Sequence, residues 1–255
     1  MPKLNRNGVD IYYEVHGSGP VVLLTHGYSS SSHMWKGQID VLAKDHTLVT
    51  WDMRGHGHTD YPADQSLYSE AETVEDMAAI LDAVGAEKAI IGGLSLGGYM
   101  SLAFAATYPE RVRALLIIDT GPGYKNDAAR DTWNATAEKT AERWERDGLA
   151  RLSNGGAETR TSPHRDATGL ARAARGMLAQ RNARVISALP DIKAPSIVIV
   201  GANDAPYLAA SDYMASKIPG AAKVVIPGAG HAANIDQPEA FNAAVLGFLG
   251  TLPKA

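Results

Sequence analysis

Short apolar runs alternate with amphipathic segments along most of this chain. The apolar runs have the length of strands and lie at 9–15, 21–25, 47–51, 89–91, 114–118, 196–200 and 224–226. Helical spacing of apolar residues follows at 33–43, 69–85, 99–108, 209–217 and 238–249. Strands that alternate with helices predict an α/β fold, a mostly parallel central sheet covered by helices on both faces. The first two strands, separated by a glycine-rich turn at 16–20, are expected to form an antiparallel opening pair.

The alternation stops between residue 121 and about residue 189, where no strand pattern occurs. We therefore expect a core domain made of residues 1–121 and 191–255, with residues 122–190 inserted as a small helical lid. Trp133, Ala137, Thr140 and Trp144 share one helical face in this insertion. That face either seals the lid to the body or supplies a tryptophan to the wall of an apolar pocket.

The hydrophobic content, the net charge and the absence of cysteine exclude several classes of function. A chain of 255 residues with 45% hydrophobic content can bury a full core. Its net charge of −4 argues against nucleic acid or an anionic membrane as the main partner, because both attract basic faces. The absence of cysteine excludes disulfides and thiolate chemistry. Without an apolar leader or a long apolar run, a soluble, cytoplasmic protein is expected; whether it forms homo-oligomers stays open.

A serine between glycines separates one apolar run from the helix that follows. In Gly93-Leu94-Ser95-Leu96-Gly97 the two glycines leave room for a sharp strand-to-helix turn that exposes the serine hydroxyl. The first turn of the helix directs unpaired N–H groups and the positive end of its dipole toward this hydroxyl. The alternative interpretation is a glycine-rich turn that only packs a helix close to a sheet.

An acid and a base follow later strands. Asp204 comes after the run at 196–200, and His231 after the run at 224–226. Since parallel strands present their carboxyl ends at one edge, Ser95, Asp204 and His231 are expected to converge there. His231 would take the serine proton, and Asp204 would orient the imidazole and stabilise its positive charge. Asp119, which also ends a strand, is the alternative acid.

Together these motifs resemble the α/β-hydrolases of the esterase, lactonase and haloperoxidase-like branch, similar to enol-lactone hydrolases. The resemblance rests on His26-Gly27-Tyr28, Asp52-Met53-Arg54-Gly55-His56-Gly57, Gly93-Leu94-Ser95-Leu96-Gly97, Asp204 and Gly230-His231. It implies an oxyanion hole made by the backbone N–H groups of Tyr28 and Leu96, with His26 shaping that loop. Relatives that open epoxides or displace halide carry aspartate at the nucleophile position. Serine there favours acyl transfer.

The expected protein is thus a cofactor-independent serine hydrolase of small to medium carboxylic esters or lactones, acting through a Ser95 acyl-enzyme. Perhydrolysis, carbon–carbon bond hydrolysis and amide cleavage are alternatives on the same triad. A ligand receptor on a hydrolase scaffold is the alternative from another class. The candidate pocket residues are Tyr28, Tyr124, Trp133, Trp144, Met177 and Tyr207.

The basic lid and the His and Asp residues of the loop at 52–60 each allow two interpretations. Residues 121–190 have a net charge of +4 and the rest of the chain −8, so a basic lid could attract a substrate carboxylate. The plainer interpretation is solvated helix faces with salt bridges to the body. His56 and His58, with Asp52 and Asp60, could suggest a metal site, but the resemblance makes this loop a structural turn, and no metal is expected.

Overall fold

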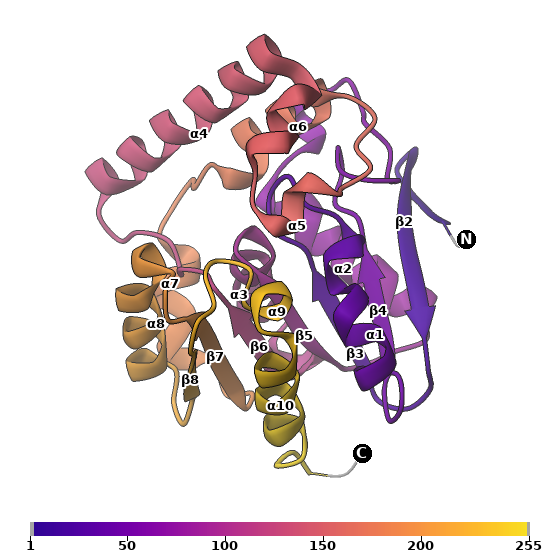
Figure 1. Ribbon diagram of the computed structural model, residues 1–255, viewed down its shortest axis with the longest axis vertical. Helices are drawn as coiled ribbons and strands as arrows, with labels where there is room; N and C mark the ends of the chain where they lie inside the picture. Colours follow the sequence, from indigo (N-terminus) through magenta and orange to yellow (C-terminus); the bar gives the residue numbers. More distant parts are fainter. Residues whose placement is uncertain (1–2, 254–255) are drawn as a thin grey trace.

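The chain folds around one eight-stranded sheet in the computed structural model, which describes residues 3–253 (Figure 1). The strands are β1 (Lys3–Arg6), β2 (Val9–His16), β3 (Val21–Thr25), β4 (Thr47–Trp51), β5 (Ala89–Leu94), β6 (Val112–Ile118), β7 (Ser196–Gly201) and β8 (Ala222–Ile226). Their spatial order is β1-β2-β4-β3-β5-β6-β7-β8. From β4 to β8 all neighbours are parallel, while β1, β2 and β4 pair antiparallel. The predicted α/β fold is confirmed.

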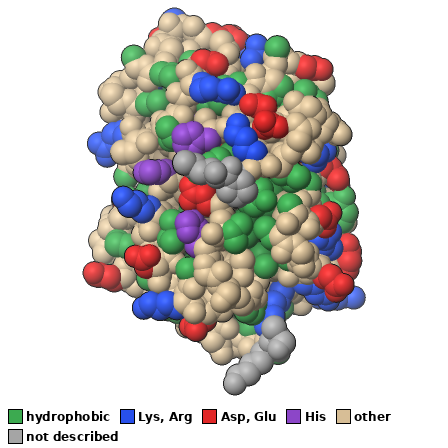
Figure 2. Space-filling view, turned by 90° about the vertical axis from the view of Figure 1, so that its right-hand side faces the viewer, with side chains coloured by type: hydrophobic (Ala, Val, Ile, Leu, Met, Phe, Trp, Pro, Cys, Tyr) green, Lys and Arg blue, Asp and Glu red, His purple; other side chains and the backbone are tan. Residues whose placement is uncertain are grey.

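The prediction that the strands at 9–15 and 21–25 pair with each other was wrong. β2 does not pair with β3: it pairs with β1 and β4, and β4 lies between β2 and β3. The turn after β2 explains this, because Gly17 and Gly19 pack directly against the backbone of residues 43–46, which leads into β4. β1 is not predicted from the sequence, because it contains no apolar run and its Lys3 and Asn5 are exposed. Figure 2 shows the side of the molecule on which β2 lies, where Lys and Arg side chains are interspersed with Asp and Glu.

Helices cover both faces of the sheet, as predicted (Figure 1). Those of the core are α1 (Lys36–Leu42), α2 (Glu70–Ala83), α3 (Leu96–Thr107), α8 (Ala205–Lys217), α9 (Ala233–Asp236) and α10 (Pro238–Leu249), with 3-10 turns at Ser32–Trp35, Gln65–Leu67, Pro109–Arg111 and Leu189–Asp191. Successive strand residues point to opposite faces. In β3, Leu23 packs into the core under α2 and α3, whereas Val22 and Leu24 pack into the core under α1 and α10.

The insertion is helical between β6 and β7. It contains α4 (Asp127–Asp147), a 3-10 segment (Gly148–Asn154), α5 (Ala157–Arg160), α6 (Ala167–Ala173), a π-helical turn (Ala174–Leu178) and α7 (Arg184–Ala188). Trp144 on α4 packs with Leu170 and Ala174 into a small cluster of its own, so the apolar face of α4 holds this inserted segment, called the cap below, together. Across residues 3–253, no helix is both long and apolar enough to cross a membrane.

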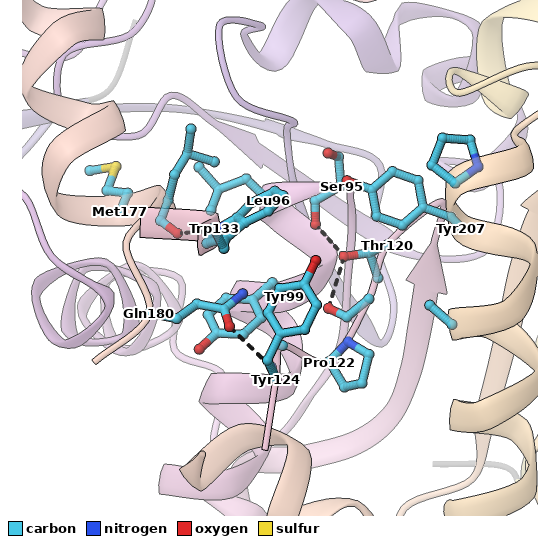
Figure 3. A pocket seen from close by; sticks show the side chains of 15 residues that line it. Ser95, Leu96, Tyr99, Thr120, Pro122, Tyr124, Trp133, Met177, Gln180 and Tyr207 are labelled. Atoms are coloured by element: carbon cyan, nitrogen blue, oxygen red, sulfur yellow. Dashed lines mark hydrogen bonds between the residues drawn. The ribbon is translucent and has the colours of Figure 1, made fainter. Parts of the chain in front are cut away.

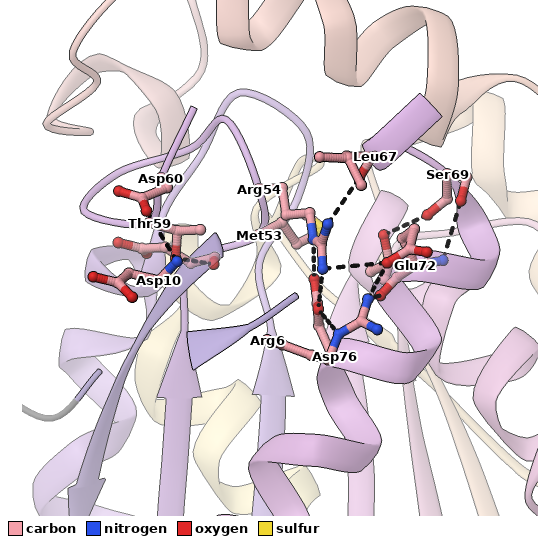
Figure 4. A network of polar contacts seen from close by, with 12 residues as sticks. Arg6, Asp10, Met53, Arg54, Thr59, Asp60, Leu67, Ser69, Glu72 and Asp76 are labelled. Atoms are coloured by element: carbon pink, nitrogen blue, oxygen red, sulfur yellow. Dashed lines mark hydrogen bonds and ion pairs between the residues drawn. The ribbon is translucent and has the colours of Figure 1, made fainter. Parts of the chain in front are cut away.

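A buried ion network fixes the loop after β4 (Figure 4). The Arg54 guanidinium is fully buried, and its Nε and Nη2 donate to the two carboxylate oxygens of Asp76 on α2 at 2.7 and 2.8 Å. Arg6 from β1 and Glu72 from α2 complete the network. A buried charge is tolerated only when it is paired and hydrogen-bonded. The network therefore ties β1, α2 and this loop into one unit.

Candidate active site

Ser95 lies at a strained turn between β5 and α3. Its φ of 56° and ψ of −117° are unfavourable for a residue with a side chain. A Cβ on Gly93 would lie less than 3.0 Å from the backbone of Gly97, and one on Gly97 less than 3.0 Å from the carbonyl oxygen of Thr25. The Thr120 hydroxyl donates to the Ser95 carbonyl at 2.6 Å and supports the turn. The glycine spacing thus produces the geometry that the sequence predicts.

Asp204 and His231 are hydrogen-bonded at the same sheet edge. Nδ1 of His231 lies 2.8 Å from Oδ2 of Asp204, which follows β7 and is almost fully buried. Because an ionised carboxylate only accepts, Nδ1 carries the proton and Nε2 is left as the basic nitrogen. Burial lowers the pKa of His231, but the hydrogen bond and charge of Asp204 outweigh this, so that the pKa is raised above 6.5.

The alternative acid, Asp119, has other partners. It follows β6, and its two carboxylate oxygens accept from the N–H groups of Gly201 at 2.7 Å and Ala233 at 3.4 Å. Burial raises the pKa of Asp119 to about 7. Since no hydrogen bond joins it to His231 within residues 3–253, the geometry favours Asp204 as the partner of the imidazole.

The two backbone N–H groups expected to form the oxyanion hole belong to segments beside the serine. A Cβ built on Gly27 would lie 3.5 Å from the Cβ of Ser95, so the loop that carries Tyr28 packs on the turn. Leu96 is the first residue of α3. Neither Tyr28 N–H nor Leu96 N–H donates a hydrogen bond to another group of residues 3–253. Both donors are available to a ligand.

Ser95 and His231 line the same cavity, of about 620 Å³, but no hydrogen bond joins their side chains in the described part of the chain. The phenol of Tyr207 lies close to both instead. Its ring stacks on the imidazole with 5.1 Å between centroids and 24° between planes, and its hydroxyl end is directed at Ser95 (Figure 3). Hydrogen bonds between catalytic groups commonly tighten only when substrate binds.

His26 is a structural residue of the oxyanion loop, in agreement with the expectation from the resemblance. Nε2 accepts the N–H of Met53 at 2.9 Å, so Nδ1 carries the proton and donates to the Gly27 carbonyl at 2.7 Å. Both ring nitrogens therefore bind backbone. Complete burial lowers the pKa of His26 to about 4, which keeps the ring neutral.

Two further buried histidines join the cap to this loop, and one of them, His164, was not predicted from the sequence. His56 accepts from the Ser29 N–H, and His164, from the cap, accepts from the Gly57 N–H and donates to the Ser29 carbonyl. Burial lowers the pKa of both rings. Nothing local in the sequence marks His164, because its partners lie more than 100 residues away.

The groups considered for a metal site are already engaged. The other ring nitrogen of His56 contacts the Arg54 carbonyl at 3.0 Å, so both nitrogens of this ring bind backbone. The carboxylate oxygens of Asp52 accept the N–H groups of Ser32 and His58. Within residues 3–253, no three His, Asp or Glu side chains are arranged to hold a metal ion.

Two cavities meet at Ser95. The smaller, of about 270 Å³, is mostly apolar, and the larger, of about 620 Å³, contains His231. The predicted pocket residues all line one or both: Tyr124, Met177 and Tyr207 the smaller cavity, Tyr28 and Trp144 the larger, and Trp133 both. Leu178 was not among the predicted pocket residues. Its carbonyl oxygen accepts the Trp133 indole N–H at 2.6 Å, and both residues line both cavities, so this pair forms the partition between them.

Most of the cap arginines that make described ion pairs do so away from the serine. Arg175 bridges Glu138 and Glu145 within the cap, and Arg184 pairs with Glu70 of the body. Arg151 lines the larger cavity, where the carboxylates of Asp147 and Glu158 also lie. This distribution favours the plainer interpretation of the basic cap, salt bridges and solvated faces, over a general attraction for carboxylates.

Known proteins match this chain in both sequence and fold. A sequence model of the family described as "alpha/beta hydrolase fold" matches residues 20–154. The chain is 29% identical to a putative 2-succinyl-6-hydroxy-2,4-cyclohexadiene-1-carboxylate synthase of Bacillus subtilis, covering 95% of this chain and 96% of the relative. It is 28% identical to 3-oxoadipate enol-lactonase 1 of Acinetobacter baylyi, with 97% and 96% covered. The solved structure of a thermophilic esterase from Thermogutta terrifontis superposes with a TM-score of 0.83 at 28% identity, covering 98% of each chain.

Proposed function

Because the chain belongs to the α/β hydrolase fold family, we propose that it is a serine hydrolase that cleaves small to medium carboxylic esters or lactones through a Ser95 acyl-enzyme. The observation that carries the proposal is the hydrogen bond between Asp204 and His231 at the cavity that Ser95 lines. The names of the esterase and the enol-lactonase among its relatives agree with this substrate class.

The proposed acylation uses the neutral imidazole as base. Nε2 of His231 takes the Ser95 proton while Oγ attacks the carbonyl carbon of the substrate. The carbonyl oxygen becomes an oxyanion that accepts from the N–H groups of Tyr28 and Leu96. Asp204 stabilises the imidazolium, which next protonates the alcohol oxygen as the ester bond breaks.

Deacylation repeats these steps with water as the nucleophile. His231 deprotonates the water, which attacks the acyl carbonyl, and the imidazolium returns its proton to Ser95 Oγ as the acid leaves. In a lactone the leaving alcohol stays attached to the acyl group, so that one hydroxy acid is released. Besides the substrate and water, the proposed chemistry uses only groups of this chain.

The leaving group and the acyl group would occupy different cavities. The leaving oxygen must lie near Nε2 of His231, and His231 lines only the larger cavity. The acyl chain then extends into the smaller one. Its volume of about 270 Å³ fits a short acyl chain, in line with a small to medium substrate.

The test is hydrolysis of p-nitrophenyl acetate by wild type and by Ser95→Ala. We expect Ser95→Ala to reduce turnover to the background rate while the circular dichroism spectrum stays unchanged. The matched control is Ser216→Ala, which removes an exposed hydroxyl bonded only to a carbonyl of its own helix. Wild-type activity in Ser95→Ala would overturn the proposal. Stoichiometric acylation without turnover would instead favour a ligand receptor.

A further inference from the structure

Tyr207 does more than line the smaller cavity. It lies on the first turn of α8, three residues after Asp204, where its N–H donates to the Asp204 carbonyl at 2.9 Å. The same side chain stacks on His231, and its hydroxyl end is directed at the Ser95 side chain (Figure 3). One residue therefore contacts two members of the proposed triad and is linked through its backbone to the third.

The phenol is a hydrogen-bond donor at neutral pH. Burial raises the pKa of Tyr207 above its ordinary value of 10, so the hydroxyl keeps its proton. This hydroxyl is directed at the Ser95 side chain (Figure 3). Acylation converts Ser95 Oγ into an ester oxygen, and the acyl chain fills the cavity and excludes water. The Tyr207 hydroxyl then needs an acceptor from the acyl group itself.

A second donor opens onto the same cavity. Oε1 of Gln180 accepts the N–H of Tyr124 at 3.1 Å, which fixes the orientation of the amide. Nε2 of Gln180 makes no hydrogen bond to another group of residues 3–253 and faces the cavity (Figure 3). The indole N–H of Trp133 and the hydroxyl of Tyr99 are already used by Leu178 and Glu70. The Tyr207 hydroxyl and Gln180 Nε2 are thus hydrogen-bond donors on otherwise mostly apolar walls.

From this arrangement we propose that Tyr207 is a specificity-determining residue that selects acyl groups with an acceptor oxygen on the carbon next to the reacting carbonyl. Short alkoxyacyl esters are the corresponding substrate class. The oxygen gives the phenol an acceptor, whereas a purely alkyl chain leaves this donor unpaired in a dry cavity. Leaving a buried donor unpaired costs free energy, and the corresponding decrease in kcat/KM for the alkyl ester is about tenfold. The inference rests on the proposed acyl-enzyme function.

The experiment compares p-nitrophenyl methoxyacetate with p-nitrophenyl butyrate, in which a CH₂ group replaces the ether oxygen. The ratio of their kcat/KM values is measured in wild type and in Tyr207→Phe, so that the intrinsic reactivities of the esters cancel. We expect the ratio to fall about tenfold in Tyr207→Phe. The matched control, Tyr213→Phe, removes the same atom from α8 outside the cavity, and the ratio should stay within about twofold of wild type.

A third substrate tests the same point in the wild type alone. In p-nitrophenyl methylthioacetate a thioether, a weak acceptor, replaces the ether; the wild-type preference over butyrate should be largely lost. An unchanged ratio in Tyr207→Phe, or an equal preference for the thioether, overturns the role of Tyr207 while hydrolysis continues and the proposed function stands. If wild type hydrolyses none of these esters, or if Ser95→Ala retains the activity, the proposed function and this inference fail together.

Discussion

Replacement of Asp204 by asparagine separates the two candidate acids. In wild type, the carboxylate 2.8 Å from Nδ1 holds the proton on that nitrogen and leaves Nε2 free to act as base. An amide can donate to Nδ1, which favours the opposite tautomer and blocks the base. Loss of the acid in a serine triad by this change typically reduces kcat about 10⁴-fold, roughly 5.4 kcal/mol of transition-state stabilisation. We expect a loss of this order in kcat/KM.

The same change has a predicted direction on the pH axis. The hydrogen bond and charge of Asp204 raise the pKa of His231, whereas burial lowers it. In Asp204→Asn only the lowering effect and the weaker influence of more distant charges remain, so the acidic limb of kcat/KM should move to lower pH. In wild type the limb should lie above pH 6.5, because the base is active only when neutral.

The assay is kcat/KM for p-nitrophenyl acetate from pH 5 to pH 9 in both proteins. Asp119→Asn is the matched control, because it makes the same chemical change on a buried carboxylate that binds backbone N–H groups. Its activity should stay within about tenfold of wild type. A small loss in Asp204→Asn together with a large loss in Asp119→Asn would refute the assignment of Asp204.

Three further changes test the fold around the site. Gly97→Ala places a methyl group against the Thr25 carbonyl, so we expect a loss of about 1–3 kcal/mol in the free energy of unfolding by urea; an unchanged midpoint would contradict the packing of the turn. Arg54→Met leaves the buried Asp76 carboxylate without its main partner and should cost about 3–5 kcal/mol in the same assay, whereas a neutral effect would argue against the network. The pKa of about 4 for His26 lies below the unfolded value of 6.5, so the unfolded state binds the proton first and stability is lost as pH falls from 6.5 toward 4. Between pH 7 and 5 this corresponds to about 2 kcal/mol for His26, and the free energy of unfolding of His26→Asn should fall less than that of wild type by this amount; an identical pH dependence would contradict the neutral ring.

The features of the site that depend on local sterics could be predicted from sequence. Gly93 and Gly97 are required because no Cβ fits beside the backbone of the turn, and this requirement is visible in five consecutive residues. Asp204 and His231 each follow an apolar run. Because parallel strands present their carboxyl ends at one edge of the sheet, these positions predict that the two side chains converge. Their hydrogen bond is the structural counterpart of that prediction.

Contacts between segments that are distant in the chain could not be predicted from the sequence. The neighbours of β2 depend on how the Gly17 turn packs against residues 43–46, and no local pattern encodes this contact. The same is true of His164, which binds the loop at Ser29 from more than 100 residues away. That Tyr207 and Gln180 offer polar groups to an acyl chain became visible only when the hydrogen bonds of their neighbours were known.

The central claim is that Ser95 is a nucleophile activated by His231. Its most direct test is reaction with a p-nitrophenyl alkylphosphonate, followed by peptide mapping by mass spectrometry. The account predicts release of about one p-nitrophenolate per chain, a phosphonyl group on Ser95, and a rate of labelling that rises with pH through the His231 titration. Labelling at another residue, or undiminished ester hydrolysis after complete phosphonylation of Ser95, would contradict it.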